Sequence, residues 1–225
     1  MKNIILQHYT GELGDLEQAS VENMKQYAAK CNAEYQLVTG QVFNPIFTTP
    51  IQKLYMLDKV WDQYDTVVML DIDMFATNYT EENVFEVKGI GLHEETQKRL
   101  HRQLINTYPL LSSAITPYWG GAIYKLPKDA RETLRKPLEE GDTGWMQNFN
   151  KRYHWGDEGI VHTLAMKTGY KPEEAYMDKK WCQCSFLPEP EKAGFIHIRT
   201  KVTPTGPKRN KIENLRALQE QGVIA

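Results

Sequence analysis

The sequence lacks a long hydrophobic run, and neither sign of charge dominates it. The apolar stretch at its start, residues 1–6, turns polar at Gln7 and His8, which is too short for a signal peptide or a membrane span. Lys and Arg number 27 and Asp and Glu 29, so the formal net charge is −2 and no general positive field gathers nucleic acid. We therefore expect a cytoplasmic protein without a nucleic-acid partner or stable membrane insertion, in which a local site holds any phosphate-bearing ligand.

The sequence is also poor in cysteine, and it shows no internal repeat and no linker between domains. Its three cysteines are an odd number, and Cys182 and Cys184 would point to the same side of a strand, where they are poorly placed to bridge each other. With 41% hydrophobic residues over 225 positions, the chain can bury a sizeable core. These features predict reduced, partly buried thiols and a single domain over residues 1–225.

Strand and helix patterns alternate in the first third of the chain. Helical spacing over residues 16–30, and an N-cap followed by proline at Thr49 and Pro50, predict two helices. The apolar face of the second helix would consist of Leu54, Leu57, Val60 and Trp61. Short apolar runs predict three buried strands, at residues 3–7, 35–38 and 66–70. Apolar strands that alternate with helices indicate an α/β fold with a mainly parallel central sheet flanked by helices.

The remainder of the chain is less regular. Its patterns predict helices at residues 94–108, 157–167 and 212–221, strands at 121–126 and 195–198, and a Pro-, Gly- and Lys-rich loop at 201–211.

Two aspartates, Asp71 and Asp73, follow directly on the strand predicted at residues 66–70. Their period-two spacing places both carboxylates on one side of the chain, at the carboxyl end of a buried strand, where open α/β sheets bind ligands. Such a pair can hold Mg²⁺ or Mn²⁺, whose coordination shell is often completed by substrate phosphates. The alternative is a pair of surface aspartates in a turn.

Two classes of enzyme use an aspartate pair at a strand end. Phosphatases of the haloacid dehalogenase type need Thr or Val two residues after the second aspartate, where this chain has Phe75. They also usually carry the motif on their first strand, whereas two predicted strands come earlier here. The match to this class is therefore incomplete.

The stretch from Tyr64 to Asp73, after a strand–helix–strand unit and a helix with Lys53, resembles the nucleotide-sugar-binding half of a GT-A-fold glycosyltransferase. The plan is similar to the compact glycosyltransferase domains of large DNA viruses, over about residues 3–201. It implies a nucleotide-binding half at about residues 1–75, an acceptor-binding half at 76–201, and a loop with a C-terminal helix at 202–225. Three further segments carry the resemblance: Trp119-Gly120-Gly121-Ala122, Trp155-Gly156-Asp157-Glu158-Gly159 and Ile196-His197-Ile198-Arg199-Thr200-Lys201.

The resemblance implies a metal site formed by Asp71, Asp73 and His197, with Mn²⁺ or Mg²⁺ as the cofactor. Asp71 would contact either the metal or the ribose of the donor. An imidazole ligand suits Mn²⁺ better than Mg²⁺, although a lone histidine in a strand is more often structural. The family pattern His-x-x-Gly-x-Lys implies that Lys201 binds the donor diphosphate. This chain has no glycine there, so Arg199 is an alternative for that role.

On the donor side, the resemblance implies a nucleobase site at Gln7, His8 and Tyr9, in which Tyr9 stacks on the base and the backbone reads its edge. It also places Lys53 against the diphosphate and includes Ile72, between the two aspartates, in the donor site. The alternatives are a plain polar strand end and a solvated helix lysine.

On the acceptor side, Trp119 and Trp155 would stack on sugar rings, unless they are ordinary core residues. Gly120 and Gly121 would allow close approach of the backbone to the acceptor.

Asp157 and Glu158 would bind the acceptor, although the helix dipole alone favours acidic residues at a helix start. Asp157 would take the acceptor hydroxyl's proton in an inverting enzyme and would only position the sugar in a retaining one.

The residues and the resemblance together predict a metal-dependent glycosyltransferase. It would move a sugar from a nucleotide donor, a UDP-sugar, to a hydroxyl of a carbohydrate acceptor. The alternatives are a phosphatase of the haloacid dehalogenase type and a non-catalytic nucleotide- or sugar-binding protein. The basic loop from Thr203 to Arg209 would close over the donor; the alternative is an inert tether to the last helix. The oligomeric state stays open.

Overall fold

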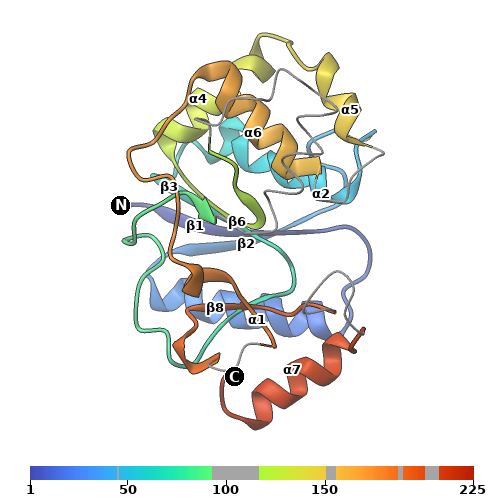
Figure 1. Ribbon diagram of the computed structural model, residues 1–225, viewed down its shortest axis with the longest axis vertical. Helices are drawn as coiled ribbons and strands as arrows, with labels where there is room; N and C mark the ends of the chain where they lie inside the picture. Colours follow the sequence, from blue (N-terminus) through green and yellow to red (C-terminus); the bar gives the residue numbers. More distant parts are fainter. Residues whose placement is uncertain (45, 93–116, 151–155, 187–189, 201–207) are drawn as a thin grey trace.

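The computed structural model describes residues 1–44, 46–92, 117–150, 156–186, 190–200 and 208–225, and it contains two β-sheets (Figure 1). The larger sheet has the strand order β2-β1-β3-β6-β5 and the smaller one β4-β8-β7. The strands of the larger sheet are β1 (Asn3–Tyr9), β2 (Glu34–Thr39), β3 (Thr66–Leu70), β5 (Gly91–Leu92) and β6 (Gly120–Pro127). Those of the smaller sheet are β4 (Met74–Ala76), β7 (Gln183–Cys184) and β8 (Phe195–His197).

The larger sheet is mainly parallel. β1 pairs in parallel with both β2 and β3. β6 runs antiparallel to β3 and to β5, so β6 alone among the described strands of this sheet runs against the others. The mainly parallel α/β sheet predicted from the sequence is therefore confirmed.

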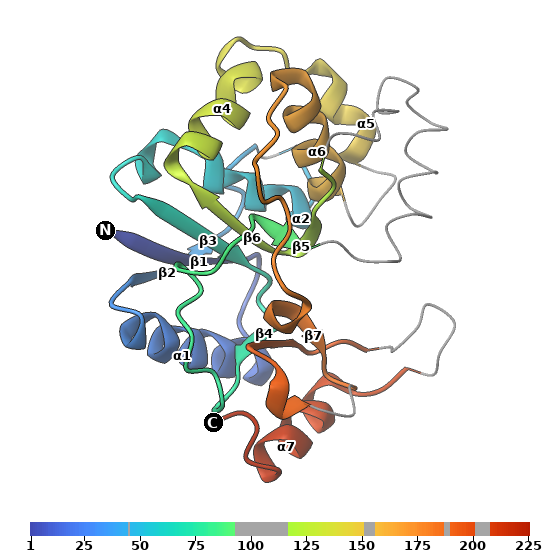
Figure 2. The same ribbon diagram turned by 60° about the vertical axis from the view of Figure 1, so that its left-hand side comes forward.

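Helices cover both faces of the larger sheet (Figures 1 and 2). On one face lie α2 (Thr49–Gln52), α4 (Lys128–Glu139), α5 (Gln147–Asn150) and α6 (Gly156–Thr168). On the other lies α1 (Asp15–Lys30), with α7 (Lys211–Glu220) beyond it. Alternate residues of β1 and β3 contribute to the two cores: Leu6 and Met69 to one, Ile5 and Val68 to the other. This is why both strands are apolar throughout.

The helix predicted from Thr49 is interrupted. α2 ends at Gln52 and is followed by two 3₁₀ turns, η1 (Lys53–Leu57) and η2 (Lys59–Trp61). Between them Asp58 adopts an extended backbone conformation, and its side chain accepts a hydrogen bond from the Val60 amide. Val60, predicted to be buried, is therefore exposed.

Helix α4 escaped the sequence analysis because arginines occupy its inner side. Arg131 is fully buried and donates to the backbone oxygens of Leu126, Trp61 and Tyr64. Arg135, also buried, forms an ion pair with Asp62. Carbonyl and carboxylate acceptors thus make buried positions available to residues that an apolar pattern excludes.

The remaining helices and strands predicted from the sequence are present wherever they fall within the described residues. The helices expected at 157–167 and 212–221 and the strands expected at 121–126 and 195–198 are present with small shifts at their ends. The helix predicted at 94–108 lies outside the described residues. Cys31, Cys182 and Cys184 are all described, and all are free thiols. Among the described residues, no helix combines the length and the apolar character needed to span a bilayer.

Gln52 fixes the loop that precedes the site. The side chain is fully buried, and its Oε1 accepts from the amides of Phe43 (2.9 Å) and Asn44 (3.4 Å). Its Nε2 donates to the carbonyls of Asn44 (2.7 Å) and Phe47 (3.0 Å). The side-chain amide of Gln52, the residue before Lys53, therefore provides hydrogen-bond partners for four backbone groups of residues 43–47.

We expect Gln52→Met to destabilise the fold by about 3 kcal/mol, because it fills the same space while leaving buried backbone groups without partners. Urea denaturation followed by circular dichroism measures this change. Gln26→Met, on the exposed face of α1, serves as the matched control and should change stability by less than about 0.5 kcal/mol. A Gln52→Met protein as stable as the control would contradict this role.

Candidate active site

The two aspartates lie in the turn between β3 and β4. Residues 67–70 of β3 are fully buried and apolar. Asp71, the polar residue that follows them, lies where the chain leaves the core. The Asp71 amide donates to the carbonyl of Ala122 (3.0 Å), which ties the turn to β6. The Asp73 carbonyl accepts from the amide of Ile198 (2.9 Å), which ties it to the C-terminal segment. The turn is thus fixed from both sides.

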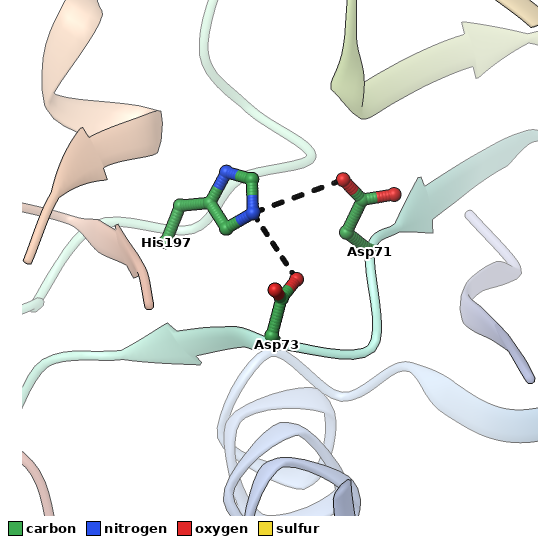
Figure 3. A group of neighbouring side chains, drawn as sticks. All are labelled: Asp71, Asp73 and His197. Carbon is green, nitrogen blue, oxygen red and sulfur yellow. Dashed lines mark ion pairs between the residues drawn. The ribbon is translucent and has the colours of Figure 1, made fainter. Parts of the chain in front are cut away.

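The smaller sheet brings His197 to this turn. β8 pairs antiparallel with β4, with His197 opposite Met74, the neighbour of Asp73. His197 Nε2 lies 3.1 Å from Asp73 Oδ1 and 3.9 Å from Asp71 Oδ2. The three side chains point toward one another, as Figure 3 shows. The cluster predicted from the resemblance is therefore assembled from residues 124 positions apart.

This donor set fits a divalent cation. One ligand atom from each of Asp71, Asp73 and His197 lies within 4.8 Å of the other two. Two carboxylate oxygens and an imidazole nitrogen suit ions such as Mn²⁺. Burial lowers the pKa of His197, but the ion pair and hydrogen bond with Asp73, together with Cys182, raise it to about 10. A metal ion at this cluster would compete with a proton for Nε2.

Lys53 lies at the centre of a second, adjoining cluster. Its ammonium contacts Asp71 Oδ1 (2.7 Å), Asp157 Oδ2 (2.8 Å) and the Gly121 carbonyl (2.6 Å). Burial lowers the pKa of Lys53, but the two carboxylates raise it by more, well above its ordinary value. The ammonium is therefore charged, and it links the aspartate turn to the start of α6.

Gly121 permits this arrangement because it has no side chain. A Cβ at this position would lie 2.6 Å from Asp157 Oδ2, closer than any ordinary contact. Its amide donates to Glu158 Oε1 (2.8 Å), while the hydroxyls of Tyr118 and Tyr124 donate to Glu158 Oε2 (3.3 Å) and Asp157 Oδ2 (3.1 Å). Burial raises the pKa of Asp157, an effect that Lys53 and Tyr124 oppose. Both acidic side chains are held by neighbours on β6.

The end of β1 is more buried than the sequence suggested. The Gln7 side chain is fully buried, donates to Ser20 Oγ (2.9 Å) and to the Asp71 carbonyl (3.0 Å), and accepts from the Tyr35 hydroxyl (2.8 Å). His8 is buried, with Nε2 at 2.7 Å from the Gly40 carbonyl, and burial lowers its pKa. Gln7 thus supports the aspartate turn through its hydrogen bond to the Asp71 carbonyl. Tyr9 is partly exposed.

Of the remaining residues predicted for the site, one lies in the core, two lie on β6 or in the aspartate turn, and two lie outside the described residues. Trp119 is 0% exposed and its indole nitrogen donates to the Ala175 carbonyl (2.7 Å). It is therefore a core residue, the alternative that the sequence left open, and it presents no ring face to a sugar. Gly120 lies in β6, and Ile72 lies half-buried in the aspartate turn. Trp155 and Lys201 lie outside the described residues.

The basic loop is described only at its end. Arg209 lies over the ring of Phe186, 4.9 Å from its centroid, and its amide donates to the Thr200 carbonyl (2.8 Å). Closure of the Thr203 to Arg209 loop stays a prediction.

Sequence reasoning missed residues that contact the site, among them Tyr118, Tyr124 and Lys211. Tyr124 reads as one more apolar residue of a strand, and nothing in the sequence indicates that its hydroxyl reaches Asp157. Lys211, the first residue of α7, forms an ion pair with Asp73 Oδ2. A lysine at a helix start, where the dipole disfavours positive charge, is the signal that would have identified it.

No family model and no curated protein sequence matches this chain. Solved structures do match over nearly its whole length. One is a glycosyltransferase involved in the glycosylation of the major capsid of PBCV-1, with a TM-score of 0.54 and 9% identity over 97% of this chain and 100% of that one.

Another is the galactosyltransferase LgtC in complex with donor and acceptor sugar analogs, with a TM-score of 0.53 and 11% identity over 96% of this chain and 95% of that one. An active-site mutant of LgtC matches with a TM-score of 0.55 and 10% identity, over the same shares of the two chains. The chain therefore has the GT-A glycosyltransferase fold that its sequence resembles, with the Asp-x-Asp pair in place.

Proposed function

We propose that this protein is a metal-dependent glycosyltransferase that moves a sugar from a nucleotide-sugar, a UDP-sugar, to a hydroxyl of a carbohydrate acceptor. The observation that carries the proposal is the cluster of Asp71, Asp73 and His197 at the carboxyl end of β3. Ligands bind at this end of the strands in open α/β sheets. The cluster lies within a fold shared with glycosyltransferases.

In this proposal, Asp71, Asp73 and His197 hold the cation, and the imidazole nitrogen favours Mn²⁺. When bound, such a cation neutralises the charge that develops on a departing nucleoside diphosphate. The chain's own contribution is to fix the ligands before the donor arrives. Backbone hydrogen bonds from Asp71 and Asp73 to two different parts of the fold do this.

Lys53 orients the carboxylates in this mechanism. Because its ammonium holds Asp71 Oδ1, the other oxygen of Asp71 is left to face His197. Its contact with Asp157 fixes the start of α6 against the same turn. We therefore assign Lys53 to positioning both sides of the site rather than to the diphosphate contact that the resemblance implies, because its three N–H donors already have acceptors.

For Asp157 we propose the positioning role rather than that of general base. The side chain is 2% exposed, and Lys53 and Tyr124 both bind its Oδ2. A base must take a proton from an acceptor hydroxyl within hydrogen-bond reach. A carboxylate that is buried and paired with an ammonium is poorly placed for this, and we propose that Asp157 positions the acceptor side of the site through Lys53 and Tyr124.

The phosphatase alternative has lost its support. The fold matches glycosyltransferases. Phe75, where that alternative needs Thr or Val, is a fully buried residue of β4 that shares an apolar cluster with Leu215 and Leu218 of α7.

The metal assignment predicts that Asp73→Asn weakens binding of a nucleoside diphosphate with Mn²⁺ by about 100-fold, because a charged ligand is lost. Isothermal titration with UDP, GDP, ADP and CDP, each with Mn²⁺ and again with a chelator, measures this and identifies the base. The control is Asp15→Asn on the exposed start of α1, which should bind like the wild type. Equal binding by Asp73→Asn and wild type, or chelator-insensitive binding, would refute the metal site.

The role of Asp157 predicts the stereochemistry of transfer. Transfer with retention of configuration does not require a carboxylate as general base, and we have assigned Asp157 to positioning. We therefore expect the product to keep the anomeric configuration of the donor sugar. Proton NMR of the first product formed, read from the anomeric coupling constant, decides this. An inverted product would return Asp157 to the role of base.

A further inference from the structure

The two aspartates of the turn are held in the same way by two lysines. Lys53 contacts Asp71 through Oδ1, and Lys211 contacts Asp73 through Oδ2. The remaining oxygen of each aspartate is the one directed at His197 Nε2. The ion pairs therefore leave the three ligand atoms facing one another, and they place a positive charge on either side of them.

The position of Lys211 is built into the fold. Asn210 caps α7, its Oδ1 accepting from the Ile212 amide (2.9 Å), so that Lys211 begins the helix at a defined place. Asn214, one turn later, donates from Nδ2 to the Arg199 carbonyl (3.2 Å). Leu215 and Leu218 share an apolar cluster with Leu16 of α1. Lys211 is thus carried by a helix anchored to the His197 segment and to α1.

This placement goes against local preference. A positive side chain in the first turn of a helix faces the positive end of the helix dipole. The Asp73 carboxylate compensates for it here. Departures of this kind from local rules are expected where a residue serves a site rather than its own helix.

Lys211 also differs from Lys53 in its access to ligands. The Lys53 side chain is 9% exposed, whereas that of Lys211 is 33% exposed. A ligand bound beside Asp73 can therefore reach the Lys211 ammonium with no change in the core. Lysine is a flexible point charge suited to phosphate oxygens.

We propose that Lys211 is a phosphate-binding residue that couples the metal to the donor: it opposes binding of the cation alone and favours binding of the cation together with a diphosphate. A lone divalent cation at Asp73 is repelled by the neighbouring ammonium. A nucleoside diphosphate brings several negative charges that attract both. This inference rests on the proposed function, because it needs a metal and a diphosphate at the same site.

The test measures two affinities with opposite expected changes. In Lys211→Gln, Mn²⁺ alone should bind several-fold more tightly, on the order of tenfold, because a neighbouring positive charge is removed. UDP at saturating Mn²⁺ should bind about tenfold more weakly, because a phosphate contact is lost. Isothermal titration gives both values, and circular dichroism confirms that the variant is folded.

Two further variants make the result specific. Lys211→Arg keeps the charge and should bind Mn²⁺ alone like the wild type. Lys25→Gln removes an exposed lysine from α1 and should leave both affinities unchanged.

The outcomes separate the two proposals. If wild type binds Mn²⁺ and UDP but Lys211→Gln changes neither affinity, or changes both in one direction, the inference about Lys211 is wrong while the proposed function stands. If neither wild type nor Lys211→Gln binds Mn²⁺ or UDP, the proposed function fails and the inference fails with it.

Discussion

The arrangement of the site depends on one buried ammonium. Lys53 lies between Asp71 and Asp157, within 2.8 Å of an oxygen of each, and also contacts the Gly121 carbonyl. Without this cation, the half-buried carboxylate of Asp71 and the buried carboxylate of Asp157 would repel each other, and Asp157 would be costly to desolvate. The ammonium therefore makes it possible for the β3–β4 turn and the start of α6 to meet. Gly121 leaves room for them, since a Cβ there would overlap Asp157.

The C-terminal segment completes the site from the opposite side. β8 adds to the short β4 strand directly after the aspartate turn, which brings His197 to Asp73. Helix α7 then packs against α1 and presents Lys211 to the same carboxylate. The smaller sheet is thus the physical reason that Asp71 and Asp73, from the first third of the chain, share one cluster with His197, from the last fifth. The cluster of Asp71, Asp73 and His197 therefore forms only when β8 has paired with β4.

The two oxygens of each aspartate have different partners, and the lysines offset the negative charge of the carboxylates. One oxygen of Asp71 and one of Asp73 hold lysines, and the others face His197. The lysines lower the repulsion between the carboxylates without occupying the atoms directed at the imidazole. Such a site gains most from a ligand that supplies a cation and an anion together. The proposed donor, a nucleotide-sugar with its metal ion, has this charge pattern, which a neutral sugar alone lacks.

The sequence by itself determined the α/β class and the strand that ends in Asp71 and Asp73, because an apolar strand running into two carboxylates is a local signal. The candidacy of His197 came from the resemblance to GT-A glycosyltransferases. Sequence reasoning missed α4, because Arg131 and Arg135 reach acceptors that only folding supplies. It left Trp119 open between core and sugar contact, since exposure depends on what packs around a ring. Tertiary structure alone decided that Lys53 bridges two carboxylates and that Lys211 reaches Asp73 from 138 positions away. Ion pairs between distant residues leave no periodic trace in the sequence, because their geometry exists only after the sheets and helices have packed.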